Sequence, residues 1–101
     1  MLPFASVIIP TYNGKVLLAG CLPALQQQSY PADRFEVIVV DDASSDDSAA
    51  WLAAEFPAVR TVLLPQNRGF IAACNAGVAA ARGEILVLLN NDTEAEPGWL
   101  A

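Results

Sequence analysis

Apolar residues fall into short runs along the chain, and polar or turn-forming residues close each run. The runs cover residues 5–10, 35–41, 59–64 and 84–90. Each run is rich in β-branched residues or leucine and is too short for a helix of ordinary length. We therefore interpret the runs as strands that are buried on both faces of a sheet.

Segments between these runs carry apolar residues at helical spacing and predict helices over residues 15–25, 49–56 and 70–81. Pro23 lies inside the first helix, where a proline kinks the helix or costs about 3 kcal/mol. The third helix is rich in alanine and glycine, so we expect it to approach the sheet closely. We expect Gly83, which follows this helix, to adopt the left-handed conformation of a helix end. In the second helix we expect an inward face made of Ala49, Leu52, Ala53 and Phe56.

The alternation of strands and helices predicts an α/β fold with three layers, in which a parallel sheet lies between helices. Parallel strands present their carboxyl ends at one edge of the sheet, and ligands bind at that edge in open α/β sheets. The run over residues 84–90 continues directly into Asn91 and Asp92. Asp92 is therefore the first candidate for a functional residue.

Composition indicates one small domain with a hydrophobic core. Apolar residues make up 54% and charged residues 16% of the 101 residues, which excludes a disordered chain. No apolar run approaches the roughly 20 residues of a membrane span, and the first residues lack the basic and apolar regions of a secretory signal. We expect a soluble, cytosolic domain in which Cys21 and Cys74 are buried thiols.

The numbers of charged residues and of histidines limit which ligands and which catalytic mechanisms fit this chain. Five basic and eleven acidic residues give a net charge of -6, which argues against a nucleic-acid partner. The chain contains no histidine, so Ser-His or Cys-His catalysis within it is excluded. An acidic protein still binds a phosphorylated small molecule if a divalent cation or a helix N-terminus neutralises the phosphates.

Polar motifs follow the predicted strands in a distinctive order. The motifs are Ser6–Asn13, Val39–Asp46, Asn67–Phe70 with Asn75–Gly77, and Leu89–Thr93. Together they resemble those of family 2 glycosyltransferases, which have the GT-A fold with a Rossmann-like half. The Asn-Asn-Asp-Thr sequence is similar to that of rhamnosyltransferase-like members. The resemblance covers essentially the whole chain and implies the strand order 3-2-1-4.

The resemblance implies a nucleotide-sugar donor at the strand ends and a divalent metal, Mg²⁺ or Mn²⁺. Pro10, Thr11 and Tyr12 would border the base and ribose, and Asp42 would hydrogen-bond the base. Asp92 would bridge the metal to the diphosphate. A metal ion with hard oxygen ligands stabilises a diphosphate leaving group and needs only one or two protein carboxylates.

Two further pairs of residues belong to the implied site. Arg68 and Gly69 are candidates for a nucleotide contact. Asn90 and Asn91 stand where many family members carry an Asp before the last Asp. Ribose or metal contacts at this position would be made by an amide, and the site would carry less negative charge.

The implied activity is transfer of a sugar from a UDP- or dTDP-sugar to a hydroxyl of a saccharide or lipid-linked acceptor. Inversion and a role in polysaccharide or glycoconjugate synthesis are inferences from the family. The general base is expected beyond Ala101, so residues 1–101 would be the donor-binding portion, truncated at its C-terminal side and inactive alone. The full-length protein would be cytoplasmic, at the inner face of the membrane. The unpaired fourth strand predicts self-association through residues 84–90.

Several of these candidate site residues also have a purely structural interpretation. Asp41 and Asp42 precede serines and are also typical of a capped helix start, and we assign Asp41 to that role. Asn91–Thr93 is also typical of a turn that closes a strand. Tyr12 is alternatively an aromatic residue that covers the edge of the core.

Two other classes of protein share parts of the pattern. A nucleotidyltransferase-like enzyme would carry a glycine- and lysine-rich phosphate loop after the first strand, but Thr11–Lys15 is poor in glycine. A receiver-type module would also have an Asp pair after a strand. Its later lysine has no counterpart, because Lys15 is the only lysine.

Overall fold

The computed structural model describes residues 3–91 and residue 100. Its strands and helices begin and end within two residues of the predicted ranges, and the short 3-10 helix η1 is not predicted by the sequence pattern. In chain order the elements are β1 (Ala5–Thr11), α1 (Lys15–Gln26), η1 (Ala32–Arg34), β2 (Phe35–Asp41), α2 (Ser48–Glu55), β3 (Arg60–Leu63), α3 (Phe70–Ala80) and β4 (Ile85–Leu88).

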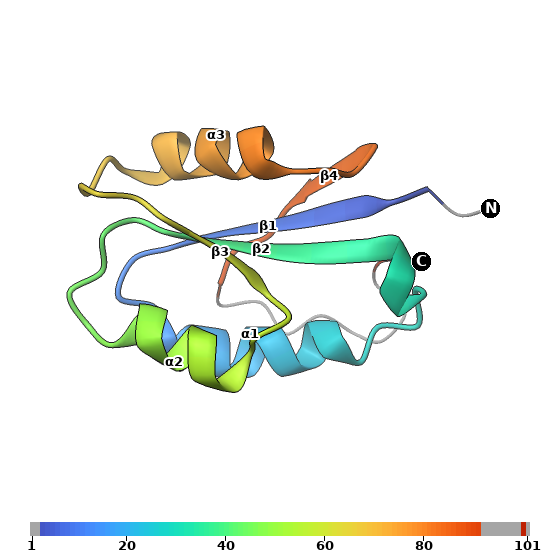
Figure 1. Ribbon diagram of the computed structural model, residues 1–101, viewed down its shortest axis with the longest axis horizontal. Helices are drawn as coiled ribbons and strands as arrows, with labels where there is room; N and C mark the ends of the chain where they lie inside the picture. The colour runs from blue at the N-terminus through green and yellow to red at the C-terminus, as the bar shows by residue number, and fades with distance from the viewer. Residues whose placement is uncertain (1–2, 92–99, 101) are drawn as a thin grey trace.

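The strands form one parallel sheet in the order β3-β2-β1-β4, as predicted. Ile8 of β1 is the register partner of Ile38 in β2 and of Leu88 in β4. α3 covers one face of the sheet, and α1 and α2 cover the other face (Figure 1). This arrangement confirms the three-layer α/β/α architecture and brings the loops after β1, β2 and β3 together at the left of Figure 1.

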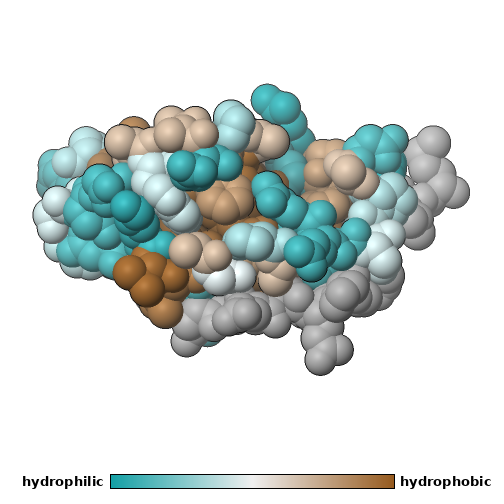
Figure 2. Space-filling model, turned by 90° about the horizontal axis from the view of Figure 1, so that it is seen from below, coloured by the Kyte–Doolittle hydropathy of each residue, from teal (hydrophilic) through white to brown (hydrophobic). Residues whose placement is uncertain are grey.

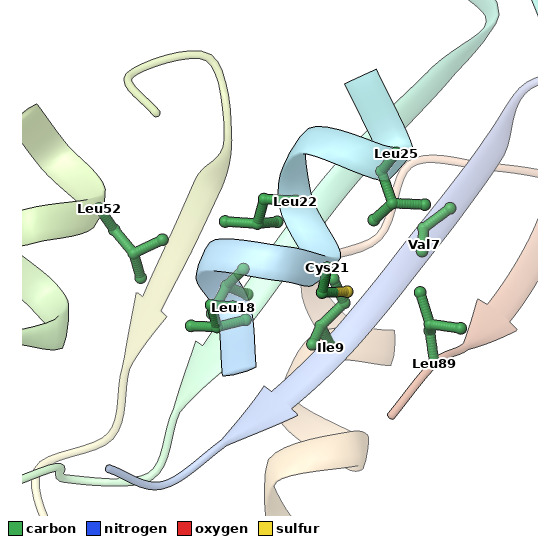
Figure 3. Packing of buried hydrophobic residues seen from close by; sticks show 9 residues of the cluster. Val7, Ile9, Leu18, Cys21, Leu22, Leu25, Leu52 and Leu89 are labelled. Atoms are coloured by element: carbon green, nitrogen blue, oxygen red, sulfur yellow. The ribbon is translucent and has the colours of Figure 1, made fainter. Parts of the chain in front are cut away.

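Alternating side chains of the central strands divide the core into two halves. Val7 and Ile9 point toward α1 and α2, where they pack with the buried leucines of these helices (Figure 3). Ile8, Ile38 and Val40 point toward α3. Because the side chains of a strand alternate between its faces, one continuous apolar run supplies both halves of the core.

Close contact between α3 and the sheet depends on Gly77. A Cβ atom at this position would overlap Ile8 Cγ2 and would lie 3.1 Å from Val40 Cγ2. The expected close approach is therefore confirmed. The expectation for Gly83 is wrong, since Gly69 is the glycine of the described residues with a positive φ, at 91°. Gly83 is required for space instead, because its Cβ would lie 2.7 Å from the backbone N of Ser6.

The helices on the other face differ from expectation in two details. α1 continues through Pro23 as one element, so the proline removes one backbone donor without ending the helix. In α2, Leu52 is fully buried but Ala53 is exposed, which corrects the expected inward position of Ala53. Adjacent helical residues are turned by about 100°, and Leu52 occupies the inward direction. Cys21 and Cys74 are both buried, as predicted.

The outer surface over α1 and α2 mixes polar and apolar residues (Figure 2). Among the described residues, no helix combines the length and the hydropathy that a membrane crossing requires.

Candidate functional site

A cavity of about 270 Å³ opens at the carboxyl edge of the sheet. It is bordered by the ends of β1 and β2, the start of α3 and Asn91, which lies three residues after the end of β4. Its lining residues are Pro10, Thr11, Tyr12, Asp42, Asn67, Gly69, Phe70, Ala73 and Asn91. The structure thus brings most of the predicted site residues together. Arg68 and Asn90 are exposed and do not line the cavity, and Asp92 lies outside the described residues.

The loop after β1 is tied to the loop after β2 by Asn13. The backbone N–H of Asn13 donates to Ser44 Oγ at 2.8 Å, and its Oδ1 accepts from the Ser45 N–H at 2.7 Å and the Asp46 N–H at 3.2 Å. Asn13 has a φ of 51°, a conformation that asparagine tolerates better than most residues. These bonds hold the loop next to Tyr12, whose side chain is 52% exposed at the cavity. Such exposure does not fit the alternative in which Tyr12 covers the core.

The two aspartates at the end of β2 have different partners. Asp41 accepts from both the hydroxyl and the backbone N–H of Ser44, at 2.5 and 3.1 Å, and so closes the local turn. Asp42 accepts from the backbone N–H groups of Arg68 and Gly69, each at 2.8 Å. Neither carboxylate caps α2, which corrects the capping role expected for Asp41.

Asp46 is the carboxylate that contacts the first residue of α2. It accepts from the backbone N–H of Ser48 at 3.0 Å and also from the Ser48 hydroxyl. The hydroxyl contact outweighs the opposing effect of burial and, with the backbone bond and the nearby Lys15, holds the pKa of Asp46 below its ordinary value. Asp46 therefore stays negatively charged near the strand ends.

The segment after β4 reaches the cavity through Asn91. Its Nδ2 donates to Thr11 Oγ1 at 3.0 Å. Gly14 makes this contact possible, because a Cβ at Gly14 would overlap Thr11 Oγ1 and lie 2.5 Å from Asn91 Nδ2. The contact uses the amino group of Asn91, so its Oδ1 is the atom that can accept a hydrogen bond or ligate a cation.

Oxygen atoms at this edge suit a hard cation but do not make a complete metal site. Within residues 3–91 and 100, no group of three or more His, Cys, Asp or Glu side chains is placed to hold a metal ion. Thr11 and Asn91 provide a hydroxyl and an amide oxygen, which Mg²⁺ and Mn²⁺ accept as ligands. The cavity's carboxylate, Asp42, already accepts two backbone N–H groups. A metal ion here would therefore need at least one ligand in addition to these described residues.

Sequence reasoning did not single out Phe70 and Ala73 as parts of the cavity, nor Asn13 as a link between loops. Phe70 and Asn13 do lie inside the motifs that carry the family resemblance. Their positions in those motifs were the signal in the sequence that could have identified them. Their roles follow only from the tertiary structure: α3 packs so that Phe70 borders the cavity, and the loops after β1 and β2 lie together at Asn13.

A larger cavity of about 470 Å³ lies at the opposite, amino edge of the sheet. Apolar side chains such as Phe4, Phe35 and Val59 dominate its lining, together with the Glu36–Arg60 ion pair. It contains none of the predicted site residues. We favour the smaller cavity because polar groups from several strand ends converge there, as at ligand sites of open α/β sheets.

The fold and the smaller cavity define an α/β protein with a candidate ligand site at the carboxyl ends of its parallel strands. The sequence matches the family model described as glycosyl transferase family 2 over residues 6–101. The chain therefore belongs to glycosyl transferase family 2. Membership in this family decides against the nucleotidyltransferase-like and receiver-type alternatives.

Relatives and solved structures agree with this membership. The chain is 35% identical over 102 residues to the glycosyltransferase AglE of Haloferax volcanii, covering 98% of this chain and 34% of AglE. S. aureus TarS 1-349 in complex with UDP superposes with a TM-score of 0.88 at 29% identity, covering 96% of this chain and 30% of that chain.

A third similarity is to the mannosyltransferase PcManGT from Pyrobaculum calidifontis in complex with GDP-Man and Mn²⁺. Its TM-score is 0.80 at 35% identity, covering 91% of this chain and 28% of that chain. The chain thus spans about a third of the length of each of these proteins. The likeness covers nearly all of this chain and supports the GT-A assignment of its sheet.

Proposed function

We propose that this chain is the donor-binding portion of a glycosyltransferase that transfers a sugar from a nucleotide-diphosphate sugar to an acceptor hydroxyl. The observation that carries the proposal is the cavity at the strand ends, where Thr11, Tyr12 and Asn91 meet the start of α3. The complexes of TarS with UDP and of PcManGT with GDP-Man support a nucleotide-sugar donor. A UDP- or dTDP-sugar is our specific proposal.

The cavity suits the nucleoside part of such a donor. Its volume of about 270 Å³ is near the lower end of the range for small-molecule pockets. The half-exposed ring of Tyr12 offers an aromatic face on which a base can stack. Pro10 and Thr11 would border the ribose, and the diphosphate would extend toward Asn91.

Neutralisation of the diphosphate is the chemical problem that this acidic chain must solve. We propose that Asp92 and the Oδ1 of Asn91 hold Mg²⁺ or Mn²⁺, which would stabilise the negative charge of the leaving diphosphate when bound. The Mn²⁺ in the PcManGT complex supports a metal in a protein of this fold. Thr11 orients Asn91 through their hydrogen bond of 3.0 Å.

Acceptor activation would require residues outside this chain. Inverting transfer needs a carboxylate that takes the proton of the acceptor hydroxyl. Asp42, the carboxylate of the described cavity, is engaged by two backbone N–H groups. We therefore propose that the base and the saccharide or lipid-linked acceptor site belong to a longer protein, on the cytoplasmic side of the membrane. Detectable sugar transfer by the purified 101-residue chain would contradict this division.

Calorimetric titration with UDP, dTDP and GDP, each with and without Mn²⁺, tests donor binding. We expect a pyrimidine diphosphate to bind in a metal-dependent manner. Asp92→Ala should abolish the metal dependence, whereas the control Asp33→Ala, in the exposed η1 segment, should not. Absence of binding by all three nucleotides, or unchanged metal dependence in Asp92→Ala, would overturn the proposal.

A further inference from the structure

The cavity of about 470 Å³ at the amino edge of the sheet has no part in the proposed function. This amino-edge cavity lies near the starts of β1, β2 and β3. β1 and β2 begin at the right of Figure 1 and end at the left, so the length of these strands separates the amino-edge cavity from the donor cavity. Pockets for small molecules have volumes of roughly 300–1,000 Å³. The amino-edge cavity is therefore large enough to hold a ligand of its own.

The floor of the amino-edge cavity is apolar. Leu22 and Leu25 of α1 line it and are each 1% exposed. Phe35 and Val37 of β2 and the neighbouring Val59 also line it, and they pack against the core between the sheet and α1 but are only partly buried. An apolar group in the cavity would remove more of these three side chains from water, which is favourable.

The rim of the amino-edge cavity carries positive charge. Glu36 accepts from Arg60 Nη1 at 2.7 Å through one oxygen and from the backbone N–H of Arg82 at 2.8 Å through the other. One carboxylate thus brings the Arg60 side chain and the Arg82 backbone to the same end of the cavity, which all three residues line. Two guanidinium groups and one carboxylate leave one net positive charge at this rim, although the whole chain has a net charge of -6.

Both arginines retain hydrogen-bond donors for a ligand. Arg60 donates to Glu36 and to the carbonyl oxygen of Ala80, at 2.7 and 2.8 Å, and both contacts use Nη1. Arg82 is exposed, and its guanidinium makes no ion pair or hydrogen bond within residues 3–91 and 100. A guanidinium binds a carboxylate through two parallel N–H···O bonds. An anionic group at the rim would therefore meet open donors.

We propose that the amino-edge cavity is a second binding site, which takes an amphipathic monocarboxylate such as a straight-chain fatty acid. The apolar chain of the ligand lies on Phe35, Val37 and Val59, and its carboxylate pairs with Arg82 and Arg60. One negative charge matches the rim, whereas a phosphate monoester carries about -1.5 to -2 at neutral pH. This site does not depend on the proposed nucleotide binding.

Calorimetric titration with octanoate and with 1-octanol tests the site, because these ligands share an apolar chain and differ in charge. We expect saturable, one-to-one binding of octanoate and weaker binding of 1-octanol. Decanoate should bind roughly ten-fold more tightly than octanoate, because two more CH₂ groups are buried. No binding of octanoate, or equal affinity for octanoate and 1-octanol, would overturn the proposal.

Two substitutions separate the contribution of charge from that of shape. Arg82→Gln keeps the backbone N–H that Glu36 accepts, and should weaken octanoate roughly ten-fold while leaving 1-octanol unchanged. Ala58→Trp changes an exposed residue of the lining and should weaken both ligands by filling the cavity.

Arg68→Gln is the matched control, because Arg68 is also exposed but does not line the amino-edge cavity. It should leave the affinity for octanoate unchanged. If Arg82→Gln binds octanoate as tightly as wild type does, or if Arg68→Gln weakens octanoate as much as Arg82→Gln, the charge of the rim does not select the ligand and the proposal is wrong.

Amide chemical shifts of the ¹⁵N-labelled chain locate the bound octanoate without any nucleotide. Octanoate should shift the signals of Val37, Val59 and Arg82, and should leave those of Tyr12 and Gly69 in place. Shifts confined to Tyr12 and Gly69 would show that octanoate enters the donor cavity instead and would overturn the second site. Since no nucleotide is used, failure of the proposed function does not affect this result.

Discussion

Glu36 is the residue whose replacement should most clearly reveal how the amino edge of the sheet is held. Its Oε1 accepts from Arg60 Nη1 at 2.7 Å, and its Oε2 accepts from the Ser6 hydroxyl at 2.7 Å and the Arg82 N–H at 2.8 Å. Ser6 Oγ in turn accepts the Gly83 N–H at 2.8 Å. One carboxylate thus connects β2 to β1, to β3 and to the segment after α3.

The number and the burial of these contacts indicate how much stability Glu36→Gln should remove. The Glu36 side chain is 10% exposed and its Arg60 partner 33% exposed, so water screens the pair only in part. Glutamine removes the charge and one acceptor oxygen, while hydrogen bonds to charged groups contribute about 1.5–3 kcal/mol each. We expect the free energy of unfolding to fall by about 2–4 kcal/mol. The urea midpoint should fall by about 1–2 M.

The pH dependence of this difference has a defined sign. Burial raises the pKa of Glu36, but the hydrogen bonds from Ser6, Arg60 and Arg82 and the charge of Arg60 outweigh it, so the pKa lies below its ordinary value of 4.5. A carboxylate with a lowered pKa in the folded state stabilises that state above its unfolded pKa. The stabilisation disappears as the pH falls through the folded pKa.

Urea unfolding of wild type and Glu36→Gln at about pH 6 and about pH 3 measures both effects. The stability difference should be complete at the higher pH and smaller at the lower pH. A difference below about 0.5 kcal/mol at pH 6 would place the contact among weak surface pairs and refute the reasoning. If the stability difference between wild type and Glu36→Gln is the same at both pH values, the negative charge of Glu36 does not contribute to stability and this part of the reasoning is refuted.

Three further outcomes follow from packing and exposure. Gly77→Ala should destabilise the chain by about 1–3 kcal/mol in urea unfolding, because its Cβ would overlap Ile8 Cγ2, and an equally stable variant would contradict this packing. Residues 84–90 should mediate self-association, since β4 is an edge strand within the described sheet and Leu86 is 46% exposed. Leu86→Lys should suppress this association in light scattering, and a monodisperse wild-type monomer would argue against it. Burial raises the pKa of Cys74, so iodoacetamide should label Cys74 much more slowly in the folded chain than in urea, and equal rates would disprove its burial.

Much of the fold could be predicted from local patterns because each pattern has one dominant physical cause. Short β-branched runs bury side chains on both faces of a strand, and α3 requires small residues wherever it touches the sheet. The error at Gly83 has an equally specific cause. The chain leaves α3 in an extended conformation at Ala81, with φ of -69° and ψ of 143°, so no left-handed residue is needed there.

The candidate site was predictable as a set of residues but not as a set of contacts. Polar residues after the strands mark the edge where a ligand binds, and Tyr12, Asp42 and Asn91 all line the cavity there. The sequence pattern does not show that Asp41 closes its own turn while Asp42 reaches Gly69, 27 residues later. Contacts at such a separation depend on the docking of α3 beside β2.

The sequence by itself determined the order of strands and helices, the buried faces of the sheet and the family to which the chain belongs. These properties follow from the spacing of apolar residues and from motifs that are contiguous along the chain. Only the tertiary structure decided that Asn13 links two loops and that Asp42 contacts the start of α3. The physical reason is that each hydrogen bond joins groups from different elements, and a parallel sheet brings those elements together at one edge only after it has formed.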